Sequence, residues 1–73
     1  MSIHEIVSEI AGSVWKIQVN AGDQVESGDE LMILESMKME IPVLADEAGV
    51  VEQVLVEQGA SVEEGQPIIT LRT

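Results

Sequence analysis

One lysine in this sequence has neighbours that distinguish it from an ordinary surface lysine. Lys38 lies between Met37 and Met39, near the middle of the 73-residue chain. A primary amine on a flexible four-carbon stem is a nucleophile once it is deprotonated, and acylation removes its charge. Two methionine side chains beside it would form an apolar, adaptable rim suited to docking against another protein. On spacing alone, an acylated lysine and an ordinary solvated turn lysine are equal alternatives.

The chain consists of two similar halves, and the Met-Lys-Met segment lies between them. Residues 11–36 and 48–73 match at an offset of 37 positions, with nine identical pairs. We place the halves at about 4–36 and 41–73, joined by Met37–Glu40. Two halves that each leave an apolar face uncovered would bury these faces against one another. The repeat therefore predicts a pseudo-twofold sandwich or flattened barrel.

Glycines recur at equivalent positions of the two halves, which indicates a shared structural role. They are Gly12, Gly22, Gly28, Gly49, Gly59 and Gly65. The later two of each half enclose a Gly-x-x-Val-x-x-Gly segment, which we interpret as a compact connection with the valine packed under it. Neither segment has the lysine or the G-x-G-x-x-G spacing of a phosphate-binding loop.

The segments between the glycines have the two-residue period of half-buried strands. Trp15, Ile17 and Val19 alternate with Lys16 and Gln18. The alternation turns Lys16 outward and makes Trp15 a partly buried sheet residue. Further strands are expected near 5–10, 31–36, 40–45 and 68–72. The pattern predicts an all-β fold.

A hairpin is expected where the two halves join. Strands over 31–37 and 40–45 would flank a two-residue loop, Lys38-Met39, with Leu34 opposite Val43. Such tight turns favour glycine or asparagine at positive φ, and this loop contains neither. A turn without its favoured residues indicates that other residues are retained there for use.

Composition and charge argue against several classes of partner and site. Fourteen acidic residues against three basic ones give a net charge of −11, so nucleic acid and anionic membranes are poor partners. The absence of cysteine excludes disulfides and thiolate metal sites. The longest apolar run, Leu31–Leu34, is far shorter than a membrane span, and no signal-peptide pattern is present. We expect one soluble, cytoplasmic domain over residues 1–73, monomeric when alone.

The central segment resembles a known attachment motif. Glu35-Ser36-Met37-Lys38-Met39-Glu40 is similar to the biotinyl-domain motif, usually Glu-Ala-Met-Lys-Met, with Ser36 in place of the more frequent alanine. The flanking glycine and valine repeats also resemble the biotinyl/lipoyl attachment family, so the resemblance covers nearly the whole chain. It is closest to free-standing biotin/lipoyl attachment proteins of the biotin carboxyl carrier type.

The resemblance implies a fold, a cofactor and partners. The fold would be a flattened β-barrel or sandwich of two four-stranded antiparallel sheets, with Lys38 on an exposed turn and the six repeated glycines as structural residues. Biotin protein ligase would join biotin to Lys38 through an amide. The biotin would carry a carboxyl group from a biotin carboxylase to a carboxyltransferase, so the chain would be a carrier with no catalytic or metal-binding residues. The residues implied in ligase recognition are Glu35, Ser36, Met37, Met39 and Glu40.

Other functions stay open beside this one. A lipoyl carrier would hold lipoate on Lys38, although lipoyl domains usually lack methionines on both sides of the lysine. An interaction module would leave Lys38 unmodified. An independent enzyme has little support, because the sole histidine, His4, lies near an N-terminus expected to fray and the acids lack metal-loop spacing. The short glycine connections have no room for the protruding segment of some acetyl-CoA carboxylase carriers, which leaves the parent carboxylase and its acceptor open.

Overall fold

A computed structural model describes residues 2–73, which form strands and connecting loops; Met1, the first residue of the expected domain, lies outside the described residues. The strands are β1 (Ile3–Val7), β2 (Gly12–Ile17), β3 (Gln24–Val25), β4 (Glu30–Ser36), β5 (Met39–Leu44), β6 (Gly49–Val54), β7 (Ser61–Val62) and β8 (Pro67–Arg72). The all-β prediction is confirmed. None of these residues belongs to a helix that could cross a membrane.

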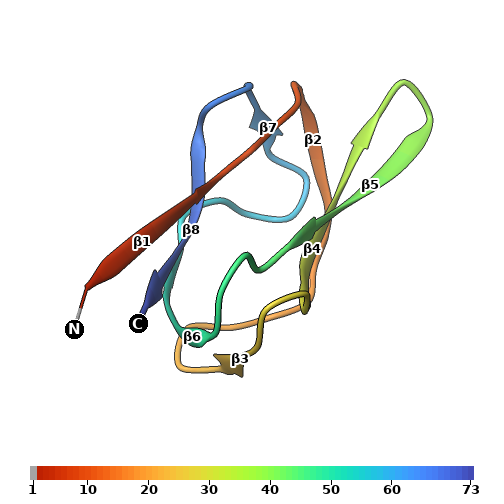
Figure 1. The fold of residues 1–73 in the computed structure, drawn as a ribbon. Coiled ribbons are helices and arrows are strands. Elements are labelled where there is room, and N and C mark those ends of the chain that lie inside the picture. The colour runs from red at the N-terminus through yellow and green to blue at the C-terminus, as the bar shows by residue number, and fades with distance from the viewer. Residues whose placement is uncertain (1) are drawn as a thin grey trace.

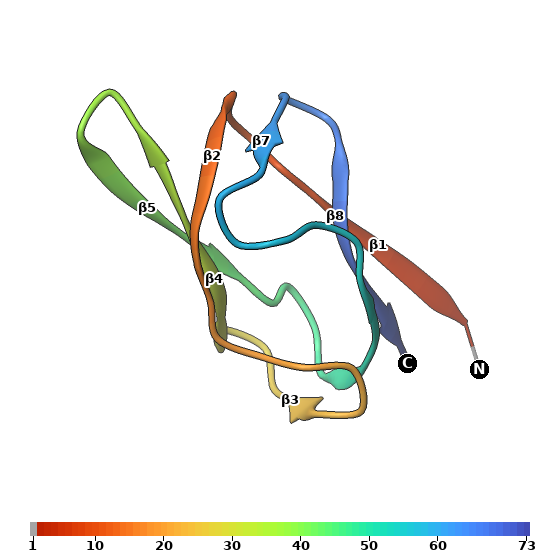
Figure 2. The same ribbon diagram turned by 180° about the vertical axis from the view of Figure 1, so that it is seen from behind.

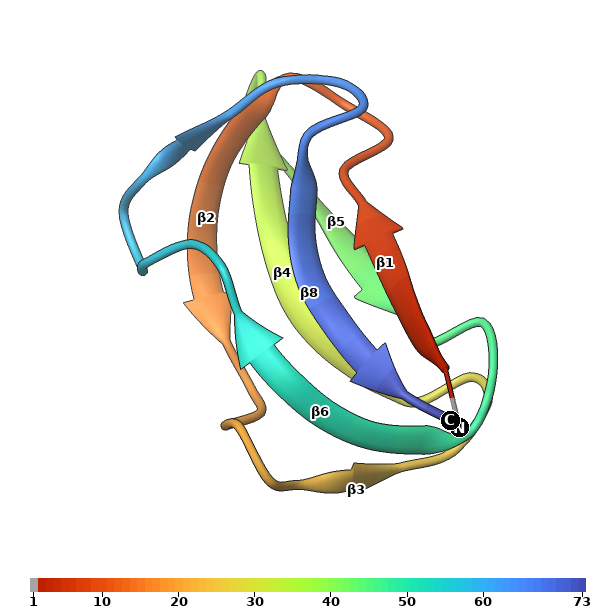
Figure 3. The ribbon, with the colours of Figure 1, turned by 90° about the vertical axis from the view of Figure 1, so that its left-hand side faces the viewer.

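The strands form two four-stranded antiparallel sheets that pack face to face. Their strand orders are β1-β8-β6-β3 and β5-β4-β2-β7. Figure 3 shows the two layers with β8 and β6 in front of β4 and β2. Within residues 2–73 no strand pairing joins one sheet to the other. The fold is therefore the sandwich form of the expected architecture and not a closed barrel.

The two halves of the sequence exchange strands between the layers. β6 and β7 begin and end 37 residues after β2 and β3, so the repeat is visible in the strand bounds. Successive strands alternate between the sheets along each half, and each sheet takes two strands from each half. The two halves bury their apolar residues in one shared core, as expected, and each layer of the sandwich contains strands of both halves. The compact glycine connections carry the chain across the sandwich, so neither half can form a layer alone.

Backbone hydrogen bonds at these connections link one half to the other. Gly22 N–H donates to Val51 O and its equivalent Gly59 N–H donates to Val14 O, both at 2.7 Å. Two further glycine bonds cross between the halves in the same way at 2.8 Å. The four donors have φ between 86° and 95°, where a side chain would be strained. They are Gly22, Gly28, Gly59 and Gly65.

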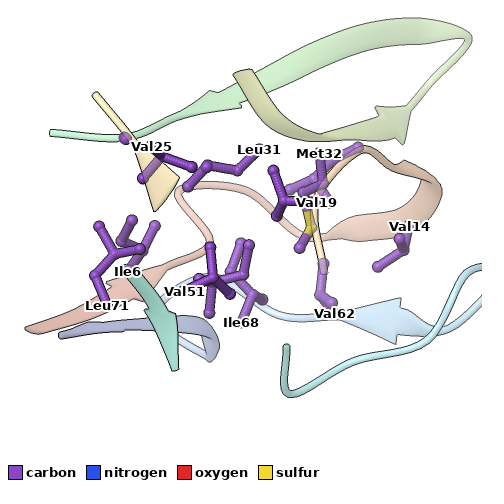
Figure 4. Close-up of a cluster of buried hydrophobic side chains, with 13 residues drawn as sticks. Ile6, Val14, Val19, Val25, Leu31, Met32, Val51, Val62, Ile68 and Leu71 are labelled. Carbon is purple, nitrogen blue, oxygen red and sulfur yellow. The ribbon is translucent and has the colours of Figure 1, made fainter. Parts of the chain in front are cut away.

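The hydrophobic core lies between the two sheets. Figure 4 shows side chains from both layers pointing into this space, among them Val25 and Val62 from the glycine-flanked segments. These two valines are 4% and 2% exposed, which confirms that each packs under its connection. The buried apolar residues are Ile6, Val14, Val19, Val25, Leu31, Met32, Leu34, Ala45, Val51, Val62, Ile68, Ile69 and Leu71.

A β-bulge changes the strand alternation predicted around Trp15. Pairing of β2 with β4 shifts between Val14 and Lys16, which leaves Trp15 without a partner in β4. Val14 is buried and Trp15 is 46% exposed, so Trp15 does not share the inward face of Val19. Lys16 is exposed, as predicted. The equivalent position of the second half, Glu52, lies at the same irregularity in the pairing of β6 with β8.

The N-terminal strand is anchored at both ends. Ser2 N–H donates to Thr73 O at 3.1 Å and Thr73 N–H donates to Ser2 O at 2.9 Å, so the expected fraying near His4 is wrong. The strand predicted near 5–10 is Ile3–Val7. It ends at Ser8, whose buried hydroxyl donates to the carbonyl of Ile10 at 2.6 Å and turns the chain. Figures 1 and 2 show the two chain ends side by side.

His4, in the edge strand β1, contacts a residue that follows β5, the edge strand of the other sheet. Its Nε2 lies 2.8 Å from Asp46 Oδ2, which joins β1 to the segment that follows β5. The hydrogen bond to Asp46 raises the pKa of His4 above its ordinary value of 6.5, and the charges of Asp46 and Glu47 act in the same direction. This contact is absent from the sequence-based prediction because the two residues are 42 positions apart.

A histidine titration measures this contact. Asp46→Asn should lower the pKa of His4 towards its ordinary value, whereas Glu47→Gln, the matched control, should lower it less, because Glu47 contributes least. NMR titration of the imidazole protons gives each value. Because the folded pKa is raised, the contact stabilises the fold fully below the unfolded pKa of about 6.5 and loses this effect as the pH rises through the folded pKa. Coincident titrations of the wild type and Asp46→Asn would contradict the contact.

Candidate functional site

The connection between β4 and β5 differs from every other connection among residues 2–73, because it joins neighbouring strands of one sheet. It is therefore the sole hairpin between consecutive strands in the described chain. The hairpin extends away from the sandwich, with its tip at the end of the molecule opposite the two chain ends (Figures 1 and 2). The molecule is elongated, at 37 × 18 × 17 Å.

The hairpin turn consists of Met37 and Lys38. Ser36 pairs with Met39, and Leu34 pairs with Ile41. The predicted loop, Lys38-Met39 with Leu34 opposite Val43, is wrong by one residue. Moving a two-residue turn by one position changes each cross-strand partner by two, so every side chain keeps its face. The alternation of apolar residues therefore could not distinguish the two registers.

Both turn residues have left-handed backbone conformations. Met37 has φ 51° and Lys38 has φ 66°, and they are the non-glycine residues with positive φ in the described chain. A two-residue hairpin of type I′ requires this geometry, which costs about 1–2 kcal/mol per residue with a Cβ atom. The Met37 side chain is 93% exposed, so burial does not offset the cost. The positive φ angles agree with the inference from the sequence. This turn contains a methionine and a lysine although its left-handed conformation favours glycine or asparagine.

The turn presents the Lys38 amine to solvent. The side chain is exposed, and no hydrogen bond or ion pair joins its Nζ to another residue of the described chain. Lys16 is also exposed, but it lies within β2 and pairs through its backbone with Ile33 of the central strand β4. Lys38 is therefore the lysine that stands at a tip, where another protein can enclose it.

The residues beside the turn form a mixed apolar and acidic rim. Met37 and Met39 are 93% and 63% exposed. Glu35 pairs directly with Glu40, and both side chains are exposed. Two carboxylates directly opposite each other on neighbouring strands repel. The hairpin thus places the five flanking residues singled out in the sequence around Lys38, with Ser36 half-buried opposite Met39.

Gly12 holds the base of the hairpin against β2. A Cβ atom on Gly12 would lie 2.5 Å from the carbonyl oxygen of Glu35, closer than a side chain tolerates. Gly49, its equivalent, would meet the carbonyl of Arg72 at 2.7 Å. The repeat predicted a shared role for this pair, and the close approach of two backbones is a physical reason for it.

Residues 2–73 contain no cluster of histidine and carboxylate side chains suited to a metal ion.

The fold and the hairpin are those of a carrier domain, which presents one side chain to other proteins. Residues 3–71 match the biotin/lipoyl family model, whose description is "Biotin-requiring enzyme". The chain belongs to this family of biotin and lipoyl attachment domains.

Proteins of known name and structure agree with this assignment. The biotin/lipoyl attachment protein of Bacillus subtilis is 51% identical over 63 residues, which cover 86% of each chain. A biotinylated protein TB7.3 homolog of Mycobacterium leprae is 46% identical over 92% of this chain and 94% of its own. The crystal structure of Kluyveromyces lactis urea carboxylase superposes with a TM-score of 0.92 and 35% identity. That match covers 99% of this chain and 6% of the carboxylase.

The left-handed conformation of Met37 can be tested by substitution. Asparagine tolerates positive φ better than methionine does, so Met37→Asn should raise the free energy of unfolding by about 0.5–1 kcal/mol. Urea denaturation followed by far-UV circular dichroism measures the change. Met39→Asn is the matched control, because Met39 lies in a strand, where asparagine is disfavoured. A loss of stability in Met37→Asn would show that the turn adopts another geometry.

Proposed function

We propose that Lys38 is the residue of this carrier domain to which biotin is covalently attached. The observation that carries the proposal is the position of Lys38 in the turn of the β4–β5 hairpin, which is the one hairpin between consecutive strands among residues 2–73 and has positive φ at both turn residues. Within the family shown above, the cofactor needs a lysine that another enzyme can reach. Lys38 meets this requirement, and Lys16 lies within a paired strand.

The residues of the chain supply position and a nucleophile. Once deprotonated, the Lys38 amine would attack the carboxyl carbon of biotin that ATP has activated as a phosphate ester. The C–N bond would form as the C–O bond to the phosphate breaks, the phosphate group would leave, the nitrogen would release a proton, and the side chain would lose its positive charge. When bound, biotin supplies the atom that takes up and releases a carboxyl group. The lysine stem and the cofactor tail together would reach on the order of 14 Å by ordinary bond lengths. A rigid hairpin with a mobile arm raises the local concentration of the cofactor at each partner site.

Three kinds of partner follow from this role. A biotin protein ligase loads Lys38, a biotin carboxylase adds the carboxyl group and a carboxyltransferase removes it. Matches to urea carboxylase and to a single-chain long-chain acyl-CoA carboxylase, of which this chain spans 6% and 7%, support the association with carboxylases. The acidic chain would work in the cytoplasm as one monomeric domain over residues 1–73. The parent carboxylase and the acceptor substrate are separate questions.

Ligase recognition would use the rim around Lys38. The exposed methionines Met37 and Met39 offer apolar contact on both sides of the amine. Glu35 and Glu40 offer two carboxylates on one face of the hairpin, and half-buried Ser36, a small residue, pairs with Met39. Lipoate is less favoured than biotin as the cargo, because methionines on both sides of the lysine are unusual in lipoyl domains.

Mass measurement tests the attachment residue. Incubation of the chain with a biotin protein ligase, biotin and ATP should add one biotinyl group, because one lysine stands at a projecting tip. Lys38→Arg keeps the charge but cannot form the amide, so it should show no adduct. Lys16→Arg is the matched control and should be loaded as the wild type is. Mass spectrometry of the intact chains gives the result.

Each alternative function has its own outcome in the same experiment. A biotin adduct on Lys38→Arg would show that biotin is attached to a residue other than Lys38. No biotin adduct on the wild type, together with an adduct formed by a lipoate ligase, would replace biotin with lipoate. No adduct with either ligase, and none on chain isolated from its host, would leave an unmodified interaction module.

The paired acids are tested by two neutral substitutions. Glu35→Gln and Glu40→Gln should each raise the free energy of unfolding by about 0.2–1 kcal/mol, since each removes a like-charge pair. If the carboxylates contact the ligase, the same variants should lower the loading rate by about threefold or more. Glu26→Gln, an exposed acid on the turn between β3 and β4, at the opposite end of β4 from Glu35, is the matched control for both measurements. Unchanged loading rates would remove the two acids from ligase recognition.

A further inference from the structure

The methionine sulfur atoms that the structure describes fall into two separate environments. The sequence has four methionines and no cysteine, so every sulfur atom is a thioether. Met32 is fully buried in the core at 0% exposure. Met37 and Met39 are 93% and 63% exposed and stand on either side of Lys38. The oxidisable sulfur atoms described outside the core are thus concentrated at the attachment hairpin.

The chemistry available to an exposed thioether is oxidation by a peroxide. A lone pair on sulfur attacks one oxygen of hydrogen peroxide; the S–O bond forms as the O–O bond breaks, and water leaves with both protons. Sulfur loses two electrons and peroxide gains two, so methionine sulfoxide and water are the only products. Hydrogen peroxide is uncharged near neutral pH, so the carboxylates of Glu35 and Glu40 do not repel it.

We propose that Met37 and Met39 form a reversible oxidation site that controls the loading of Lys38. The proposal rests on the function proposed above, because it concerns recognition of the same lysine by its ligase. Reduced methionines give the ligase an apolar rim, and the sulfoxides give it a polar and chiral one. Burying a sulfoxide without a hydrogen-bond donor opposes complex formation.

Oxidation at this site leaves the fold in place. Neither side chain belongs to the core between the sheets, and Met37 has 93% of its surface in solvent. The backbone of Met39 pairs with Ser36 through atoms that oxidation does not change. Oxidation of Met32, by contrast, would place a polar oxygen among buried apolar side chains. Peroxide can therefore oxidise the methionines of the hairpin, and so change the surface that the ligase contacts, without disturbing the core between the sheets.

Exposure sets the order of reaction and permits reversal. Met37, at the turn, should react first, Met39 in the strand next, and Met32 only after unfolding. Methionine sulfoxide reductases act on exposed residues, with one enzyme for each sulfoxide epimer. The exposed hairpin gives these enzymes the same access that it gives peroxide.

The experiment treats the folded, unloaded chain with graded hydrogen peroxide and removes the peroxide with catalase before any enzyme is added. Cleavage after glutamate then separates Met32, in residues 31–35, from Met37 and Met39, in residues 36–40. Mass spectrometry should find oxygen in the second peptide well before the first. Ligase loading of the oxidised chain should be about tenfold slower than that of the untreated chain. Methionine sulfoxide reductases A and B together should restore it.

Two variants separate this role from general damage. In Met37→Leu/Met39→Leu, peroxide should leave the loading rate at that variant's own untreated value. Met32→Leu is the matched control and should keep the full sensitivity of the wild type. Circular dichroism before and after treatment should coincide, which shows that the fold is intact.

The two proposals fail in different ways. If the untreated chain is not loaded at all, the proposed function fails. If the untreated chain is loaded and a chain carrying sulfoxides at both positions is loaded equally fast, the oxidation site is overturned. Slower loading that persists in Met37→Leu/Met39→Leu would also overturn it, because the sensitive atoms would then lie elsewhere.

Discussion

The structure depends on hydrogen bonds that run from one half of the chain to the other. Glycine N–H groups of each half donate to carbonyls of the other at 2.7–2.8 Å, from backbone conformations that a side chain would strain. Because the chain crosses the sandwich at these connections, each sheet needs strands from both halves. Neither half can satisfy its strand edges or cover its apolar face alone. A chain of 73 residues without cysteine thereby obtains one shared core.

This interlocking explains why the one hairpin is a suitable place for an attached cofactor. β4 is a central strand, paired with β2 on one side and β5 on the other, and Gly12 brings β2 into close backbone contact at the hairpin base. The base is therefore fixed by the sandwich. The tip can then carry features that cost stability, such as two residues with positive φ and an opposed pair of glutamates. Costs of this kind occur where a structure serves recognition.

The sequence predicted the fold and the exposed position of Lys38 on a hairpin better than it predicted local geometry. The 37-residue repeat and the alternation of apolar residues indicated the all-β sandwich, and the Met-Lys-Met segment indicated Lys38. The turn was placed one residue too late, because both registers give each side chain the same face. The bulge at Trp15 also escaped prediction, since one unpaired residue leaves no mark in a short alternating segment. The exchange of strands between layers depends on long-range pairing, which periodicity does not encode.

The pairing of Ser2 with Thr73 has a consequence for how such a domain can be connected. The repeat offset places these residues at positions equivalent to Met39 and Ser36, so the two chain ends form an open counterpart of the closed hairpin. The ends lie at one pole of the molecule and the lysine tip at the other (Figures 1 and 2). A flexible linker joined to the chain ends would leave every β-ladder intact. It would also leave the end of the molecule that carries Lys38 unobstructed. The same duplication that builds the core thus places the chain ends and the Lys38 hairpin at opposite ends of the domain.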